Sequence, residues 1–314
     1  MPVQRKMSEQ EREKALKRIL AQEKADMTKP LLGVSIALVA VFGFMGFIDM
    51  IGSVSLPFDP IDYAIFGMLA LLGPYGFYAS KREKLIHEIE TRLPDFLRDV
   101  AEAGRFGMTL ADAIVVASSG RYGRLTPEIK KMAAQIEWGV PATEAIRLFS
   151  ERVKTPLVTR MASIIMKAND AGGNVADVLS MVSHDAKETI LTEEERGVTM
   201  QTYVLVIYIA FFVFIATIII LEAQFLPKMA EAGQTVSDSA AKAGIVGDIP
   251  GVNIQTDIIP EISFILLLSV LVHAIGDGIL AGVISNGSIP IGMRHSFIML
   301  IAGFITLRLL FGGA

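Results

Sequence analysis

The sequence predicts an all-α fold: a polytopic helical membrane protein with about five transmembrane helices and a six-helix bundle domain inserted between the second and the third. The chain has 314 residues and is 52% hydrophobic, which is more apolar surface than one soluble core of this length normally buries. Several runs reach the roughly 20 apolar residues that a helix needs to cross a bilayer. Between two of these runs, helix-start signals recur without strand-like alternation.

Five apolar segments are the expected spans. The clearest runs uncharged from Gly197 to Leu221. The other four are Leu31–Phe47, Tyr63–Ala79, Ile262–Ile284 and Ser296–Phe311. The expected organisation is a charged N-terminal helix over 1–29, a transmembrane hairpin over 30–80, a helical domain over 81–200, a third transmembrane helix over 201–226, an extracytoplasmic loop over 227–257 and C-terminal transmembrane helices over 258–314.

Basic residues predict how the chain is oriented in the membrane. Residues 1–29 carry eight Lys or Arg and residues 81–200 carry seventeen, whereas the hairpin tip over 52–61 carries none and the loop over 227–257 carries two. Segments rich in Lys and Arg next to spans stay on the cytoplasmic side. We therefore expect a multi-pass protein of the cell membrane whose N-terminus and 81–200 domain are cytoplasmic.

Capping residues and prolines mark helix starts inside the domain. Thr109 is a plausible N-cap, with Asp112 three residues later as its capping-box partner. Proline at the first helical position loses no hydrogen bond, so a threonine directly before proline also predicts a start. The other expected starts are Thr126-Pro127, Gly139-Val140-Pro141 and Thr155-Pro156.

The first and last helices of the domain connect it to the spans. The first is expected from about Lys84 to Arg105, with Pro94 near a bend or restart. The last is expected to begin near Asn174 and to run directly into the third span. Such a continuous helix would couple the domain rigidly to the membrane.

A short pattern recurs at the turns: a glycine, then an acid, then a small and an aliphatic residue. The candidate helix-turn motif positions are Gly107 and Asp112, Gly139 and Glu144, and, in a weaker form that starts at Gly173, Gly172, Gly173 and Asp177. Glycine can end a helix in a left-handed conformation, and an acid complements the dipole of the next helix. Taken alone, the pattern indicates helix-turn-helix punctuation.

Common catalytic and metal-binding patterns are absent from the sequence. There is no phosphate-binding loop, no H-E-x-x-H and no G-x-S-x-G motif, so the chain is not expected to be a motor ATPase or an enzyme. The chain has no cysteine, and its four histidines are scattered over separate segments. We expect no catalytic residue, no cofactor and no metal, and nothing in the sequence favours nucleic-acid binding.

Polar residues inside the expected spans are functional candidates, because ionisable groups are costly in lipid. These candidates are His273, Asp277 and Arg308. A transporter would use His273 and Asp277 as an ion or proton relay, but it leaves the large helical domain unexplained. An aspartyl peptidase would need a G-x-G-D motif around Asp277, and Ala274 stands where its first glycine should be. A structural role, with Asp277 paired to His273 or Arg308, is the third interpretation.

Three motifs in order carry a family resemblance. They are Glu102-Ala103-Gly104 followed by Leu110-Ala111-Asp112-Ala113-Ile114, then Gly139 to Ile146, then Ala171 to Leu179. Together they resemble the cytoplasmic domain of the F family of type II secretion, the inner-membrane platform proteins of type II secretion, type IV pilus, tight-adherence pilus and archaellum machines. The resemblance covers roughly residues 81–226, and the order of spans is similar to that of the tight-adherence and archaeal branches.

The resemblance implies a non-catalytic platform. Its partners would be a cytoplasmic hexameric secretion ATPase and pilin-like or archaellin subunits, and Arg121 and Arg124 are candidate ATPase-facing residues. Many family members carry two such cytoplasmic domains, and this sequence shows one. The resemblance therefore also implies a homodimer or a related platform protein as a partner.

Overall fold

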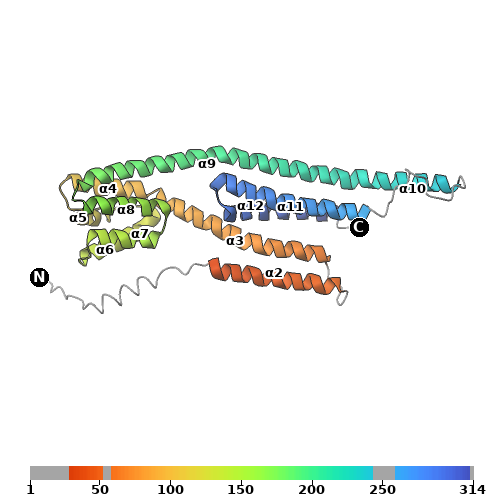
Figure 1. Cartoon of the computed structure of the whole chain (residues 1–314), viewed down its shortest axis with the longest axis horizontal. Helices are drawn as coiled ribbons and strands as arrows, with labels where there is room; N and C mark the ends of the chain where they lie inside the picture. Colours follow the sequence, from red (N-terminus) through yellow and green to blue (C-terminus); the bar gives the residue numbers. More distant parts are fainter. Residues whose placement is uncertain (1–27, 52–57, 243–258, 312–314) are drawn as a thin grey trace. The chain divides into compact units, whose positions relative to one another are not determined.

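The computed structural model describes residues 28–51, 58–242 and 259–311, and within these ranges it is helical and has no strand, which confirms the all-α polytopic class (Figure 1). The helix expected over 1–29 lies almost entirely outside the described residues. The helices in chain order are α2 (Thr28–Met50), α3 (Pro60–Glu90), α4 (Leu93–Arg105), α5 (Leu110–Ala117), the 3₁₀ turn η1 (Gly123–Leu125), α6 (Thr126–Glu137), α7 (Ala142–Val153), α8 (Pro156–Asp170), α9 (Val175–Ile220), the π-helical turn η2 (Leu221–Phe225), α10 (Leu226–Lys242), α11 (Ile259–Asn286) and α12 (Ile289–Phe311).

The described chain divides into two compact units. The helical domain holds Lys81–Arg196, and the membrane unit holds Pro30–Ser80 together with Gly197–Ala314. Each unit has its own cluster of buried apolar side chains.

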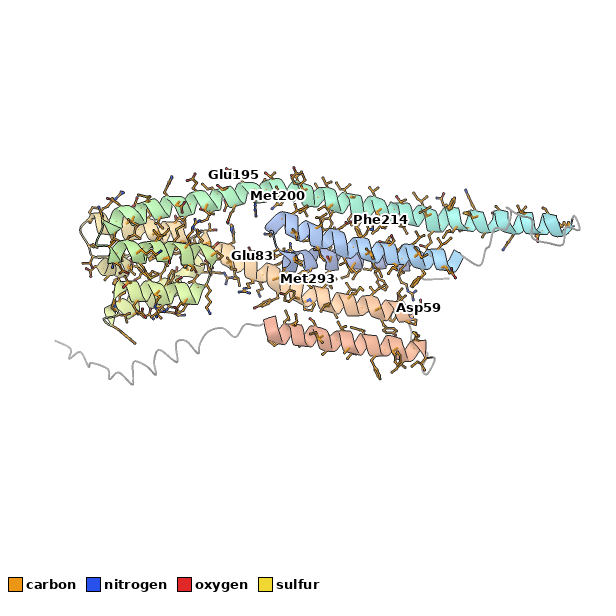
Figure 2. All side chains as sticks on the ribbon, viewed as in Figure 1. Asp59, Glu83, Glu195, Met200, Phe214 and Met293 are labelled. Carbon is orange, nitrogen blue, oxygen red and sulfur yellow. The ribbon has the colours of Figure 1, made fainter. Side chains whose placement is uncertain are left out.

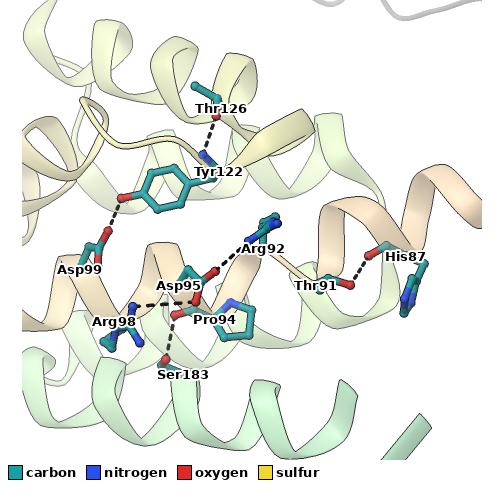
Figure 3. A network of polar contacts seen from close by, with 10 residues as sticks. All are labelled: His87, Thr91, Arg92, Pro94, Asp95, Arg98, Asp99, Tyr122, Thr126 and Ser183. Carbon is teal, nitrogen blue, oxygen red and sulfur yellow. Dashed lines mark hydrogen bonds and ion pairs between the residues drawn. The ribbon is translucent and has the colours of Figure 1, made fainter. Parts of the chain in front are cut away.

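The start of the helical domain shows the restart expected near Pro94, and the helix before it begins at Pro60, well before the expected Lys84. α3 ends at Glu90 and α4 begins at Leu93, so the helix is interrupted at Thr91 and Arg92. A new helix then starts with Pro94 in its first turn. The break is stabilised locally, because the hydroxyl of Thr91 donates to the carbonyl of His87 at 2.7 Å (Figure 3). Pro94 restarts a helix here because its missing N–H falls where no intrahelical bond is made.

The core of the helical domain is built from the apolar faces of α4 to α9. Two polar contacts cross this core (Figure 3): the hydroxyl of Ser183 on α9 donates to the carbonyl of Pro94 at 2.8 Å, and the phenol of Tyr122 donates to Asp99 on α4 at 2.6 Å. Burial, together with the bond to Asp99, raises the pKa of Tyr122 above its usual value, so the phenol stays protonated as a donor.

The expected caps are confirmed at two of three threonines. Thr109 accepts from the backbone N–H of Asp112, and Thr155 accepts from that of Val158. The prediction was wrong at Thr126, which is the first residue of α6 and has helical backbone angles. The 3₁₀ turn η1 leads straight into α6, so Leu125 takes the cap position and the Thr126 hydroxyl accepts from Tyr122 N–H at 2.8 Å (Figure 3).

Four helical stretches of the described chain are long and apolar enough to cross a membrane: Pro30–Met50, Val175–Val236, Glu261–Asn286 and Ile289–Arg308. At most 33% of the residues in the apolar window of each are buried in the protein, so lipid is the natural solvent for the rest. The expected span Tyr63–Ala79 lies in α3 and is not among the four, because several Gly, Tyr and Pro residues lower its hydropathy. The count of five spans therefore stays a prediction.

Beyond the third span, the chain differs from the loop expected over 227–257. α9 runs unbroken for 46 residues, as the helix expected near Asn174 should, and is followed by η2 and then by α10. Pro227 does not stop the helix, because the wider π-helical turn directly before it relieves the clash with the preceding turn. The remainder of the expected loop, residues 243–257, lies outside the described residues.

α11 and α12 form a hairpin whose centre is made of small residues. A Cβ added at Gly282 would overlap the backbone of Gly292, and one added at Gly278 would overlap Ser296. The hydroxyl of Ser296 donates to the carbonyl of Ile275 at 2.8 Å. Small residues four apart on both helices let the backbones approach closely, which is how helices associate in lipid. α12 begins at Ile289, seven residues before the start expected from hydropathy.

Candidate interaction surface of the helical domain

Three turns of the helical domain share one backbone design. Gly107, Gly139 and Gly172 have positive φ angles of 83°, 87° and 65°. Each glycine stands two residues before the N-cap of the next helix and five residues before an acid at the third position of that helix. The N-caps are Thr109, Pro141 and Asn174, and the acids are Asp112, Glu144 and Asp177. Glycine is favoured here because a left-handed backbone strains a residue with a side chain.

The third turn lies in a different register from the one that the sequence pattern suggested. The weaker motif was aligned on Gly173, but the left-handed residue is Gly172, and a Cβ added at Gly173 would make only ordinary contact with the Ala168 carbonyl at 3.8 Å. Counted from Gly172, the N-cap Asn174 is two residues on and Asp177 is five residues on, which are the same spacings as in the first two turns.

The three acids are held in place by local contacts. Thr109 accepts from the N–H of Asp112 at 3.2 Å, and its hydroxyl donates to the Asp112 carboxylate at 2.7 Å. This differs from a capping box, in which the carboxylate would take the backbone N–H of the cap. Asn174 repeats the arrangement, because its Oδ1 accepts from the N–H of Asp177 and its Nδ2 donates to that carboxylate at 2.6 Å.

Glu144 uses a different partner because its cap is Pro141, which has no polar side chain. Its carboxylate accepts two hydrogen bonds from Arg147, at 2.8 and 2.6 Å. These bonds lower the pKa of Glu144 below its usual value, since their effect exceeds that of burial. All three acids therefore have structural roles at helix starts, which agrees with the interpretation as turn punctuation.

The three glycine turns lie at the same end of the bundle. Successive helices reverse direction, so the α4–α5, α6–α7 and α8–α9 connections meet at one end. Contacts at this end join the end of α4 to the start of α9, as in the bond from Arg105 NH2 to Ser180 Oγ at 3.1 Å. Contacts at the other end join the end of α7 to the start of α6, where Arg152 binds Glu128 at 2.9 Å. We call residues 106–109, 138–141 and 171–174 the turn face; α9 begins there, at the left end in Figure 1.

The turn face carries two large aromatic side chains in solvent. Phe106 is 86% exposed and Trp138, the single tryptophan of the chain, is 70% exposed. Each stands directly before a left-handed glycine, and Met108, two residues after Phe106, is 41% exposed. Exposed aromatic residues at one place are typical of protein–protein interfaces. The sequence interpretation did not select them, although Phe106-Gly107 and Trp138-Gly139 occupy equivalent positions in the pattern.

The two candidate ATPase-facing arginines lie in the α5–α6 connection, at the end opposite the turn face. Arg124 forms an ion pair with Glu88 of α3, and its side chain is 61% exposed. Arg121 is exposed. The structure therefore does not bring these arginines together with the glycine turns.

The polar candidates of the membrane unit do not form one group. Arg308 pairs with Asp59 and Asp62 at the start of α3, each at 2.9 Å, and not with Asp277 as the structural interpretation suggested (Asp59 is labelled in Figure 2). The ring of His273 stacks on Phe214 of α9, with centroids 4.1 Å apart. Gly278 beside Asp277 is a packing glycine of the α11–α12 hairpin, which explains its presence without a peptidase motif.

Within the described ranges, no group of three or more His, Asp or Glu side chains is arranged to hold a metal ion. Two polar contacts of the helical domain drawn in Figure 3 instead hold its parts together: Ser183 of α9 binds Pro94 of α4, and Tyr122 of the α5–α6 connection binds Asp99 of α4. The turn face is thus the feature of the helical domain that combines a repeated backbone design with exposed apolar side chains.

Comparison with known proteins finds one matching family model and two similar proteins. Residues 96–222 match the family model described as Type II secretion system (T2SS), protein F. An uncharacterized protein of Methanocaldococcus jannaschii is 28% identical over 256 residues, which is 82% of this chain and 40% of that relative. Flagella accessory protein J of the same organism is 24% identical over 155 residues, or 48% of this chain and 28% of the relative. The chain thus spans less than half the length of either relative. No solved structure matches the chain.

Proposed function

The chain carries a type II secretion system protein F domain, and from this premise we propose that it is a membrane platform protein of a type II secretion, type IV pilus-like or archaellum assembly machine. It lies in the cell membrane with the helical domain in the cytoplasm. It couples a hexameric secretion ATPase to the assembly of pilin-like or archaellin subunits, and it has no catalytic activity of its own.

The observation that carries this proposal is the course of α9. This single helix of 46 residues begins at the turn face, and its C-terminal part is the apolar segment that crosses the membrane. A force applied to the turn face would act on the N-terminal end of α9. Because the backbone hydrogen bonds of a helix resist stretching, such a helix passes displacement along its axis.

The turn face is the surface that we assign to the ATPase. Phe106 and Trp138 are exposed there on the outside of well-packed turns, and large aromatic anchors supply much of the binding energy of interfaces. The arginine alternative, with Arg121 and Arg124 at the opposite end, makes a different prediction and can be tested in the same experiment.

The test is co-purification of the full-length chain with the secretion ATPase encoded beside it. The double change Phe106→Ser and Trp138→Ser should reduce recovery of the ATPase at least tenfold, because both anchors are lost. The matched control is Val116→Ser, which removes an apolar side chain that is 51% exposed outside the turn face and should leave recovery unchanged. The pair Arg121→Gln and Arg124→Gln tests the opposite end.

Each result has a defined meaning. Loss of the ATPase with the arginine pair alone would move the contact surface to the α5–α6 connection. Failure of the unchanged chain to bind any ATPase, or a gene neighbourhood without both an ATPase and a pilin-like protein, would overturn the coupling role.

We also propose that two platform domains meet in the working machine, through a homodimer or a related platform protein. The match of residues 96–222 to the secretion family supports this proposal, because many members of that family carry two such domains. Light scattering of the purified protein would show a mass of two chains for the homodimer and of one chain if the second domain comes from a partner.

A further inference from the structure

A second polar cluster of the membrane unit is separate from the candidates considered above. It lies where the first turns of α12 pass α9. The phenol oxygen of Tyr208 is 2.8 Å from Nδ1 of His295, and the two rings meet edge to face with centroids 5.8 Å apart. A guanidinium nitrogen of Arg294 is 3.4 Å from Nε2 of the same histidine. All three side chains are half-buried.

The donors and acceptors of this cluster can be assigned from the arginine. A guanidinium carries only donors, so Nε2 of His295 accepts from Arg294. A neutral imidazole that accepts at Nε2 carries its proton on Nδ1, which then donates to the oxygen of Tyr208. The hydroxyl hydrogen of Tyr208 is left to donate elsewhere. The cluster therefore offers hydrogen-bond donors at both ends, the phenol at one and the guanidinium at the other.

Arg294 also differs from the other arginine of α12. Arg308 has two carboxylate partners, Asp59 and Asp62. Among the residues that the structure describes, Arg294 forms no ion pair with a carboxylate, and its side chain contacts the neutral ring of His295. A half-buried cation without a negative partner is costly in an apolar setting, so an external anion would stabilise it.

The depth of the cluster points to the chemistry of that anion. Arg294 is the sixth residue of α12, which places its Cα about 8 Å along the axis from the start of this membrane-crossing helix. A long side chain at this depth reaches the layer of lipid head groups. Gly76 of α3 lies against the backbone of Arg294, so three helices surround the cluster. Basic sites between transmembrane helices at this level suit anionic head groups, and the guanidinium fork matches two phosphate oxygens.

We propose that Arg294, His295 and Tyr208 form a binding site for the phosphate group of an anionic lipid. Arg294 supplies the charge and two parallel N–H donors. Tyr208 supplies the hydroxyl donor, and His295 holds both in place through its two ring nitrogens. Bound lipid would join α9 to the α11–α12 hairpin at this level of the membrane.

The experiment measures thermal unfolding of the purified full-length chain in a neutral detergent. Dioleoyl phosphatidylglycerol, dioleoylglycerol or inorganic phosphate is added to separate samples. A ligand that binds only the folded state raises Tm. We expect phosphatidylglycerol to raise Tm by several degrees and dioleoylglycerol, which lacks phosphate, to leave it unchanged. An equal rise with inorganic phosphate alone would identify soluble phosphate as the source of the same group.

Variants of the cluster, with one control outside it, link the effect to these residues. Tyr208→Phe removes only the hydroxyl group and Arg294→Gln replaces the cation by a neutral amide, and each should reduce the lipid-dependent rise at least fivefold. Arg82→Gln, which removes an exposed cation of α3, should retain it. If Arg294→Gln does not fold, Arg294→Lys keeps the charge without the fork and should show a reduced rise. The proposal is overturned if the unchanged chain shows no rise, if dioleoylglycerol is as effective, or if the Arg294 and Tyr208 variants respond as the unchanged chain does.

Discussion

The guanidinium of Arg308 near the end of α12 lies 2.9 Å from Oδ2 of Asp62 in the first turn of α3, whose carboxylate is 2% exposed. The same guanidinium contacts Asp59, which is 63% exposed. The backbone N–H of Asp59 donates to Asp62 at 3.3 Å, so the buried carboxylate has two donors. This contact holds the start of α3 against the end of α12 within the membrane unit.

Asp62→Asn should destabilise the protein by about 3 kcal/mol, because it leaves the Arg308 charge with one exposed partner. Asp59→Asn is the matched control and should cost under about 1 kcal/mol, since exposed ion pairs contribute little. Thermal unfolding of the purified chain in detergent distinguishes the two. An equal decrease in stability for the two variants would show that the buried contact with Asp62 contributes no more than the exposed contact with Asp59.

Gly282→Ala should loosen the α11–α12 hairpin, because its Cβ would overlap the backbone of Gly292. Pushing two packed helices apart costs about 1–3 kcal/mol. Gly276→Ala on the same helix has nothing within 4 Å of the added Cβ and serves as the control. Tm of the two variants would be compared in the same detergent, and a lower Tm for Gly276→Ala than for Gly282→Ala would contradict the close approach.

Gly172→Ala should destabilise the helical domain by about 1–2 kcal/mol, because an L-residue is strained at a φ of 65°. Gly173→Ala should be neutral or stabilise by up to about 1 kcal/mol, since its backbone is not left-handed and its Cβ has room. Unfolding in urea, followed by the fluorescence of Trp138, measures both. The reverse order would restore the register first suggested by the sequence.

The stability of the helical domain should fall in acid through Glu128. Burial alone would raise the pKa of this carboxyl, but hydrogen bonds from Lys131 and Arg152 outweigh it and hold the pKa below the ordinary value of 4.5. A pKa that is lower in the folded than in the unfolded state contributes stability above the unfolded value, and this is lost as pH falls below 4.5 through the folded one.

Glu128→Gln should therefore flatten the dependence of unfolding free energy on pH in the range below 4.5 and lower stability at neutral pH. Glu137→Gln, an exposed acid at the end of the same helix, is the control. Urea unfolding at a series of pH values gives the slope. An unchanged slope in Glu128→Gln would show that the contact between α6 and α7 does not depend on this charge.

Local signals explain why much of the helical domain could be predicted. A cap and its partner lie within a few residues, so Thr109 with Asp112 and Thr155 with its proline were recognisable without tertiary information. The prediction that Thr126 is a cap was wrong because η1 directly precedes this residue. Nothing in the adjacent sequence distinguishes a 3₁₀ turn from the extended backbone of a cap. The starting glycine of the third turn was predicted wrongly because Gly172 and Gly173 are adjacent, and only their backbone angles show which one is left-handed.

The sequence by itself determined the all-α class, the apolar segments that suit a membrane, most helix starts and the three motifs that resemble the secretion family, because these depend on composition and on neighbours along the chain. Tertiary structure decided the partners of the polar residues: Arg308 binds Asp59, 249 positions away, and His295 meets Tyr208, 87 positions away. It also brought Phe106 and Trp138 to one face. Such contacts depend on how helices pack, and helical periodicity specifies which face is apolar but not which helix covers it.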